Sequence, residues 1–301
     1  MRVVITGGTG FIGKSLSRAL VSKGYQVISL TRSSRPSEIS GVRNVVWDGV
    51  SSAGWIEYAD GADAIVNLAG ENIASGRWSA VKKNSILASR VDAGRAVSEA
   101  VAKAKVKPKV VIQGSAIGFY GDCGPEPVNE KSPKGDLFLS DVAEKWEASS
   151  VSIEEHGVRR AVIRTAMVLG KGGALAKMMG PFKVGLGSYL GPGHQGVSWI
   201  HIDDEVRAII FLIENEKCSG IFNLSSIHPL TFNQFANSLG AAFGRKVWMR
   251  VPAFVLKLAL GQMAEEVLLG GQFVLPTGLI DAGFKFNFTE AGEALGDIVK
   301  Q

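Results

Sequence analysis

The chain has 301 residues, of which 46% are hydrophobic, so it can bury one large core or two smaller ones. Its two cysteines and four histidines, without C-x-x-C or H-x-x-x-H spacing, exclude a disulfide framework and argue against a metal site. The net charge of +5 comes from dispersed Lys and Arg, and no apolar run approaches the roughly 20 residues that cross a bilayer. We expect a soluble, cytoplasmic protein with a small-molecule substrate and no metal, nucleic-acid or membrane partner.

Short β-branched runs alternate with helical patterns along the first two-thirds of the chain. Near-continuous apolar strands separated by helices indicate a parallel sheet that is covered on both faces. The pattern predicts a Rossmann-type α/β fold with a doubly wound parallel sheet. The expected strands are residues 3–5, 27–30, 45–47, 64–68, 110–113 and 161–163, and the expected helices are one carrying Ile12, Leu16 and Leu20 and two at about 79–104 and 139–156.

The pattern changes beyond Gly170, where residues 170–196 are rich in glycine and show little periodicity. We therefore expect a nucleotide-binding domain over residues 1–170, to which the chain returns at about 198–225. A smaller C-terminal α/β substrate domain is expected over 171–301. The elements expected beyond 196 are a helix from Asp203 and Asp204, a strand at 221–224, a helix from the capping box of Thr231 and Gln234 to 243, and a helix from Pro252 to about 269.

A glycine-rich loop, residues 6–13, joins the first strand to the first helix. Gly7, Gly10 and Gly13 stand at the spacing that a dinucleotide-binding turn requires: a tight turn, a bare backbone facing a diphosphate, and close packing of helix on strand. Free N–H groups and the helix dipole then attract the negative charge. A tight turn without a ligand is the alternative, and the position between strand and helix favours the diphosphate site.

The end of the second strand indicates which dinucleotide is bound. An NAD site usually has an acidic residue about 20 residues past the loop, which accepts a hydrogen bond from the ribose. Here the strand ends in Thr31 and Arg32, and no acid occurs before Glu38. A guanidinium with hydroxyl groups favours the 2′-phosphate of NADP, although Arg32 is also open to interpretation as a solvated surface charge.

Further short motifs follow the strands and continue to the C-terminus. They are residues 67–70, Ser115 with 118–121, 163–165, 168–170 and 199–204, and then 70–73, 89–90, 145–147, Pro252, 270–272 and 282–284. Together with the loop they resemble an extended short-chain dehydrogenase/reductase over essentially the whole chain. More narrowly, they resemble the NAD-dependent epimerase-like family of the SDR39U type.

The resemblance implies a set of cofactor-binding residues, and it places Ser115 beside the nicotinamide. Leu68 and Val168 have a second interpretation as plain core residues, and Arg90 as a structural ion-pair partner. The implied cofactor-binding residues are Gly7, Thr9, Gly10, Phe11, Ile12, Gly13, Thr31, Arg32, Leu68, Ala69, Gly70, Arg90 and Val168.

The chain departs from the superfamily at its proton donor. Active members use Tyr-x-x-x-Lys, in which the lysine lowers the pKa of the phenol that exchanges a proton with the substrate. No tyrosine of this chain has a lysine four positions on. If Lys145 occupies the usual lysine position, Asp141 takes the place of the tyrosine. Asp141 is then a substitute acid/base only if burial raises its pKa, and Tyr120 is the alternative donor.

Two functions remain open. The first is an NADP(H)-dependent, epimerase-like oxidoreductase in which Ser115 polarises the substrate oxygen, with Lys145 at the nicotinamide ribose or on the helix surface. The second is a catalytically weak NADPH sensor or partner-docking protein. A nucleic-acid or membrane-surface protein has no motif in its support. The resemblance also implies a homodimer through the helices at 79–104 and 139–156.

Overall fold

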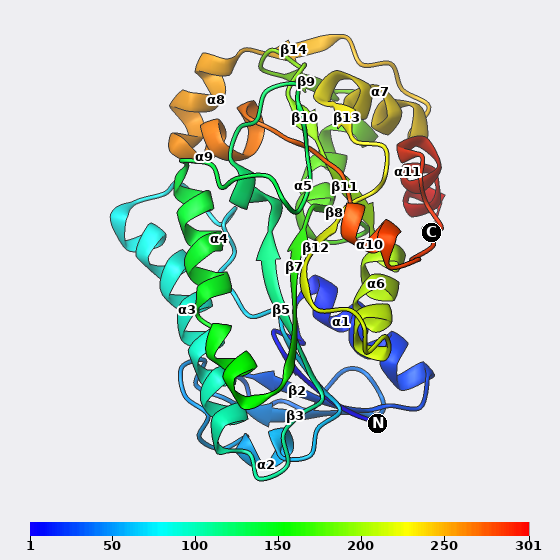
Figure 1. Cartoon of the computed structure of the whole chain (residues 1–301). Coiled ribbons are helices and arrows are strands. Elements are labelled where there is room, and N and C mark those ends of the chain that lie inside the picture. The colour runs from blue at the N-terminus through cyan, green and yellow to red at the C-terminus, as the bar shows by residue number, and fades with distance from the viewer. Residues whose placement is uncertain (301) are drawn as a thin grey trace.

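A computed structural model describes residues 1–300 and shows a seven-stranded, entirely parallel central sheet (Figure 1). The strand order is β12-β7-β5-β4-β1-β2-β3, so the direction of winding reverses between β1 and β4. The predicted Rossmann-type fold is confirmed. The strands are β1 (Arg2–Thr6), β2 (Gln26–Thr31), β3 (Val42–Val46), β4 (Ala64–Asn67), β5 (Val110–Ala116), β7 (Arg159–Thr165) and β12 (Gly220–Leu224).

Helices cover both faces of this sheet because alternate strand residues are apolar on each side. Val3 and Ile5 point into one core, which they share with the first and sixth helices, while Val4 points into the opposite core, which it shares with the third. The helices on the first side are α1 (Phe11–Ser22) and α6 (Ile202–Glu214). Those on the second side are α2 (Ile56–Ala59), α3 (Ala80–Lys103), α4 (Phe138–Ala148) and the 3-10 helix η2 (Val151–His156).

The C-terminal part has its own core, in which Trp199, Phe235 and Leu295 are fully buried. It is built on helices and strand pairs. The helices are α5 (Gly173–Lys183), α7 (Phe232–Ala242), α8 (Ala253–Leu260), α9 (Gln262–Ala264), the π-helix η3 (Glu265–Leu269), α10 (Thr277–Asp281) and α11 (Ala291–Lys300). The paired strands are β8 (Met167–Leu169) with β11 (Trp199–His201), β9 (Ser188–Leu190) with β14 (Met249–Val251), β10 (Gly196–Val197) with β13 (Leu230–Thr231), and β6 (Pro127–Val128) with β15 (Phe273–Val274).

Four sequence expectations about elements were wrong. The single helix expected at 139–156 ends at Ala148, and the separate 3-10 helix η2 follows it. The glycine-rich stretch contains helix α5, whose glycines and internal Pro181 hid the periodicity. The helix expected from Pro252 to 269 is broken after Leu260, because Gly261 has a positive φ of 62°. The third strand lies at Val42–Val46 and not at 45–47.

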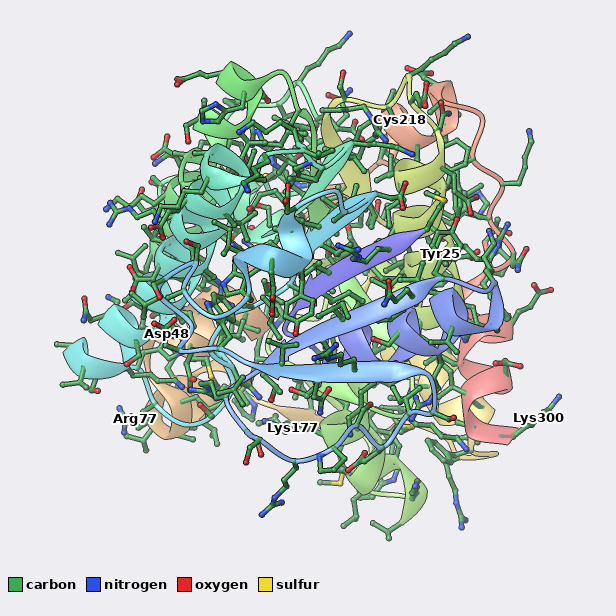
Figure 2. The ribbon with its side chains drawn as sticks, turned by 90° about the horizontal axis from the view of Figure 1, so that it is seen from below. Tyr25, Asp48, Arg77, Lys177, Cys218 and Lys300 are labelled. Atoms are coloured by element: carbon green, nitrogen blue, oxygen red, sulfur yellow. The ribbon has the colours of Figure 1, made fainter. Side chains whose placement is uncertain are left out.

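The two parts of the chain meet in several places. β12 lies at the edge of the central sheet beside β7. Lys177 of α5 donates to the carbonyl of Ala74 at 2.9 Å, and Arg77 donates to the carbonyl of Leu258 at 3.3 Å. Figure 2 shows Arg77 and Lys177 on the same side of the molecule. The segment after β4 is thus bonded to the C-terminal part at two points.

The domain boundaries at 170 and 171 stay a prediction. Among residues 1–300, no helix is long and apolar enough to cross a membrane.

Candidate functional site

The loop between β1 and α1 has the geometry of a bare backbone cradle. Gly7 has a positive φ of 68°, and a Cβ there would lie 2.8 Å from the carbonyl oxygen of Leu68. A Cβ at Gly13 would lie 2.3 Å from the carbonyl oxygen of Gly7. Gly7 and Gly13 therefore have no room for a side chain, because backbone carbonyl groups of the protein itself occupy the space.

Gly10 differs from these two glycines because it is not enclosed by protein. Its Cβ would meet only the carbonyl oxygen of Gly7, at 3.2 Å. Gly10 is the N-cap of α1, and among residues 1–300 no side chain caps that helix end. The open space above Gly10 and the uncapped helix N-terminus have the geometry and the partial positive charge that suit an anion. Thr9 directly precedes this N-cap, and Ile12 is the second residue of α1.

Phe11, the first residue of α1, joins the loop to the C-terminal part. A Cβ at Gly170 would lie 2.5 Å from its ring, and one at Gly172 would lie 2.4 Å from it. Val168 is buried in the large core and Leu68 packs against that core, so both fill the core role that the sequence left open. Their place in a cofactor groove stays a prediction.

A buried polar chain crosses the carboxyl ends of three neighbouring strands. The Thr6 hydroxyl donates to Oδ1 of Asn67 at 2.6 Å, and Nδ2 of Asn67 donates to Oε1 of Gln113 at 3.0 Å. The Thr6 hydroxyl also accepts from the amide of Ala69 at 3.1 Å. This chain fixes the backbone of Ala69 and Gly70 next to the glycine loop.

A hollow of about 240 Å³ lies beyond the loop at the end of β2. Lys14 and Arg35 supply positive charge to it, and Thr31 supplies a hydroxyl group. Glu38 also lines it, but Lys14 pairs with this carboxylate at 2.7 Å, which lowers the pKa of Glu38. The lining residues are Gly8, Thr9, Lys14, Ser29, Thr31, Ser33, Arg35, Pro36, Ser37, Glu38, Ile39, Val42 and Asn44.

The hollow contains Arg35, which the sequence did not single out, whereas Arg32 is not among its lining residues. The charge of Arg32 acts on the carboxylate of Glu71 and helps to lower the pKa of that group, after the larger effect of Lys82. Two guanidinium groups, those of Arg32 and Arg35, thus follow β2. Arg35 joins Thr31 and Arg32 as a candidate residue for the 2′-phosphate end of the cofactor.

Arg90 lies between Gly70 and Trp146. Its Cζ is 5.0 Å from the centre of the Trp146 ring, and a Cβ at Gly70 would lie 3.1 Å from the same atom. Nη1 of Arg90 donates to the carbonyls of Glu71 at 3.1 Å and Ile86 at 2.9 Å. Burial lowers the pKa of Arg90 to about 10, so the group stays charged at neutral pH. No protein partner of its Nε or Nη2 occurs in residues 1–300.

The end of β5 carries a buried charged network. Ser115 donates from Oγ to Oε1 of Glu147 at 2.7 Å. Arg164, directly beside Ser115 in the sheet register, donates from Nε and Nη2 to the two oxygens of Glu147 at 2.8 and 2.9 Å. Ser115 and Arg164 are 4% and 2% exposed. Burial opposes the charge on Arg164, but Glu147 outweighs this effect and the pKa of Arg164 is raised.

Tyr120 closes the far end of this network. Its hydroxyl donates to Oδ1 of Asn223 at 2.7 Å and accepts from Nη1 of Arg164 at 3.1 Å. Burial raises the pKa of Tyr120, and only 2% of the residue is exposed. The interpretation of Tyr120 as the alternative proton donor is not supported, because its proton is already held within the protein.

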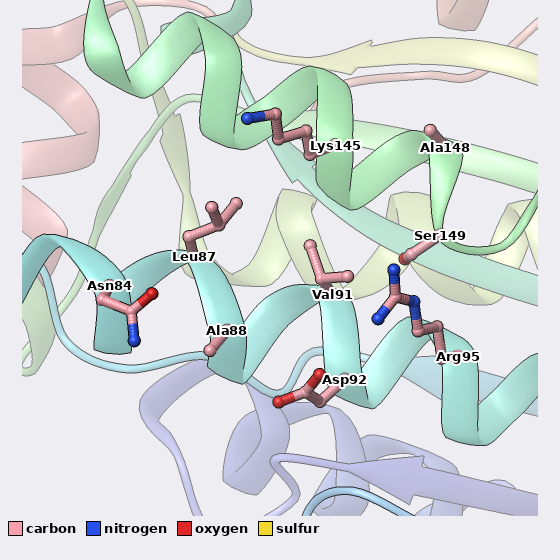
Figure 3. Close-up of a pocket in the computed structure, with 9 residues that line it drawn as sticks. All are labelled: Asn84, Leu87, Ala88, Val91, Asp92, Arg95, Lys145, Ala148 and Ser149. Carbon is pink, nitrogen blue, oxygen red and sulfur yellow. The ribbon is translucent and has the colours of Figure 1, made fainter.

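Helix α4 turns Asp141 and Lys145 away from the sheet. Asp141 is 53% exposed and pairs with Lys134 at 2.6 Å, which lowers its pKa. The substitute acid/base needed burial and a raised pKa, so that interpretation was wrong. Lys145 lines an outer hollow between α3 and α4, as Figure 3 shows, while Trp146 and Glu147 face inward. A role for Lys145 at the nicotinamide ribose is therefore not supported.

Sequence reasoning missed the residues that organise this region. Glu147 and Arg164 both stood within motifs that carry the family resemblance, but only their neighbours received roles. An arginine directly after the apolar run 161–163 is a usable signal, because a buried guanidinium requires a carboxylate. Asn67 and Gln113 are similar signals, since each places an amide in a buried strand.

A parallel sheet that reverses at β1 and β4, with a glycine cradle at that point, defines a dinucleotide-binding Rossmann protein. The NAD dependent epimerase/dehydratase family matches residues 3–225, and the chain belongs to that family. A domain of unknown function, DUF1731, matches residues 251–298.

The chain is similar to proteins of the SDR39U1 type, as its motifs indicated. It is 36% identical to the epimerase family protein YfhF of Bacillus subtilis over 300 residues, which cover 99% of this chain and 98% of that protein. It is 34% identical to human epimerase family protein SDR39U1, covering 99% and 100%. The crystal structure of human SDR39U1 (isoform 2) with NADPH matches with a TM-score of 0.90 and 34% identity over 100% of both chains. A Thermus thermophilus UDP-glucose 4-epimerase complex with NAD, 19% identical with a TM-score of 0.80, shows the shared fold alone.

Proposed function

We propose that this protein binds NADP(H) across the carboxyl ends of its parallel strands. The diphosphate is assigned to the glycine cradle, because Gly7 and Gly13 admit no side chain and α1 presents an uncapped N-terminus. The 2′-phosphate is assigned to the hollow after β2 and to the two guanidinium groups of Arg32 and Arg35. The similar human protein that was crystallised with NADPH supports the same cofactor.

The observation that carries this assignment is the charge of the hollow after β2. Because Lys14 neutralises the one acid in it, Arg35 and the hydroxyl groups of Thr31 and Ser33 face a phosphate without competition. A ribose hydroxyl of NAD would instead favour an ionised acid without a cationic partner at that point. The residues present therefore fit the phosphorylated cofactor.

We further propose an oxidoreductase, epimerase-like in its family, that acts on a small molecule. Bound NADP(H) supplies a hydride acceptor or donor. In this chain Ser115 lies at the end of a central strand where such a reaction takes place, and Glu147 and Arg164 hold it. Neither Tyr120 nor Asp141 supplies the proton in this arrangement, so the substrate must exchange it with another group or with water.

An NADPH sensor without turnover is the second candidate. One observation favours it: the Tyr120 hydroxyl donates its hydrogen bond to Asn223 and accepts one from Arg164, so its proton is held within the protein. Absorbance of NADPH in the presence of aldehydes, ketones and nucleotide sugars separates the two candidates. We expect substrate-dependent oxidation of NADPH with at least one class. Tight binding of NADPH with no turnover across the panel would contradict the enzyme and support the sensor.

The remaining expectations are unchanged by these assignments. A homodimer through α3 and α4, a cytoplasmic location, and the lack of nucleic-acid and membrane partners stay predictions. Sedimentation velocity at several protein concentrations tests the homodimer.

A further inference from the structure

The hydroxyl group of Ser115 has its direction imposed by its neighbours. Glu147 accepts three charged or polar donors, two N–H groups of Arg164 and the Ser115 hydroxyl. A carboxylate that is paired with two N–H groups of a guanidinium and with one hydroxyl group acts as the acceptor in all three contacts. The single proton of Ser115 therefore points to Glu147 and is not free for a ligand.

The lone pairs of Ser115 remain available. A hydroxyl oxygen has two acceptor positions besides its one donor, and no group in residues 1–300 donates to Oγ of Ser115. Ser115 is at the carboxyl end of β5, which pairs with β4. The carbonyl oxygen of Leu68, the residue directly after β4, would lie 2.8 Å from a Cβ on Gly7 of the glycine cradle. Ligands of open parallel sheets bind outside these strand ends. Oγ of Ser115 thus presents an acceptor at the ligand-binding edge of the sheet.

We propose that Glu147, held by Arg164, is a positioning residue that makes Ser115 a hydrogen-bond acceptor toward the ligand. The complementary ligand group is an uncharged N–H or O–H donor. This inference rests on the proposed NADP(H) function and names two sources for the donor: the carboxamide of the nicotinamide, or the hydroxyl of an alcohol substrate. It replaces the expectation that Ser115 donates a hydrogen bond to a carbonyl oxygen.

The neighbouring groups support this assignment. The network contains one positive and one negative charge, so it gives no net attraction for an ionised ligand group at Ser115. Its outer end is closed, because the third N–H contact of Arg164 goes to Tyr120 and Tyr120 donates to Asn223. Arg164, Tyr120 and Asn223 therefore offer no second acceptor toward which the Ser115 hydroxyl could turn away from Glu147.

Affinities for cofactor analogues test the carboxamide arm without any substrate. The 3-acetylpyridine analogue of NADP⁺ keeps the carbonyl group but lacks the amide N–H. If the donor is the carboxamide, the wild-type protein binds NADP⁺ about tenfold more tightly than the analogue, as expected for one lost hydrogen bond at a buried acceptor.

The alternative source, a substrate hydroxyl, is tested by titrating the NADPH complex with cyclohexanol and with cyclohexanone and following the fluorescence of the complex. If the donor is a substrate hydroxyl, the alcohol binds more tightly than the ketone.

Variants show whether the preference comes from the network. Ser115→Ala removes the acceptor and should abolish the preference for the ligand that carries the N–H or O–H donor over its analogue without one. The double variant Glu147→Leu with Arg164→Met removes both charges together, frees the Ser115 hydroxyl to rotate, and should reduce the preference to within about twofold. Tyr120→Phe leaves the Ser115–Glu147 contact intact, so this variant should keep the preference. The affinity for 2′,5′-ADP, which occupies only the adenosine end, should stay unchanged in all variants and reports an intact fold.

The outcomes are distinct. No preference in either arm for the wild-type protein, or a preference that survives in Ser115→Ala, overturns the inference while binding of NADP⁺ still supports the proposed function. Failure of wild-type protein to bind NADP⁺ and NADPH overturns the proposed function and this inference with it. If the double variant does not fold, Ser115→Ala and Tyr120→Phe decide the result.

Discussion

The two ends of the ligand-binding edge are built by different means. At β1 the backbone forms the site: Gly7, Gly10 and Gly13 leave room, and α1 supplies N–H groups. At β5 side chains form it: Ser115, Glu147 and Arg164 come from a strand, a helix and another strand. The first end admits no side chain at Gly7 and Gly13, and the second tolerates no lost partner. The comparison shows that a backbone site is determined by residues close together in the sequence, whereas a side-chain network depends on how distant elements pack.

The largest expected effect comes from breaking the network at β5. Glu147→Ala should lower the free energy of unfolding by about 3–5 kcal/mol, because it leaves the buried guanidinium of Arg164 without its carboxylate. Urea denaturation followed by tryptophan fluorescence measures the loss. The Glu147→Leu, Arg164→Met double variant is the control and should be within about 1–2 kcal/mol of wild type. A single variant as stable as the double one would contradict the account of the network.

A second buried carboxyl, Glu205 on α6, sharpens the comparison because no cation pairs with it within residues 1–300. Thr165 donates to its Oε1 at 2.9 Å, and burial raises its pKa to about 8. The unfolded chain loses this proton near pH 4–5, so between that range and about pH 8 the native state binds the extra proton. This contribution to stability is complete below the unfolded pKa and is lost as the pH rises toward 8.

Glu205→Gln should remove that dependence, since the amide is neutral in both states. The variant should gain stability relative to wild type as the pH rises, by about 3–4 kcal/mol between about pH 5 and 8. Urea denaturation at a series of pH values from about 5 to 8 gives the result. Parallel pH profiles of the two proteins would show that Glu205 is already ionised in the native state.

Gly10→Val tests the backbone end. The added side chain enters the space above the loop, where only the Gly7 carbonyl lies within reach, so the apoprotein should stay folded. Binding of NADPH and NADH should fall at least about a hundredfold, because the side chain occupies the place of the diphosphate. Thermal unfolding and calorimetric titration check the two parts of this prediction. Retained binding would mean that the loop is merely a tight turn.

The smallest expected effect concerns the hollow after β2. Arg35→Ala should weaken NADPH about tenfold and leave NADH nearly unchanged, because only NADPH carries the 2′-phosphate. Arg32→Ala, the matched variant, should also weaken NADPH more than NADH. Titrations of both variants with both cofactors decide between the two guanidinium groups. Equal losses for the two cofactors would remove the 2′-phosphate assignment.

The sequence predicted the sheet and the backbone site well, because both depend on neighbours in the chain. Apolar runs identified the strands, and the glycine spacing identified the cradle. The network at β5 was beyond such reasoning. It requires that β7 pair with β5 and that one face of α4 meet them, and neither condition is set by local spacing.

The assignment of roles on α4 failed through helix phase. Each residue of a helix turns about 100° from the last, so a shift of one or two positions moves a side chain from the inner to the outer face. Lys145 and Asp141 are on the outer face, whereas Trp146 and Glu147 contact the buried groups of β5. A motif placed correctly along the chain thus pointed to the wrong side chains.

The most direct test of the central claim is a titration of the purified protein with NADPH and, separately, with NADH, followed by quenching of tryptophan fluorescence. We expect saturable binding of both cofactors with a clear preference for NADPH, at least about tenfold. Tighter binding of NADH, or binding of neither cofactor, would contradict the assignment of this groove to NADP(H).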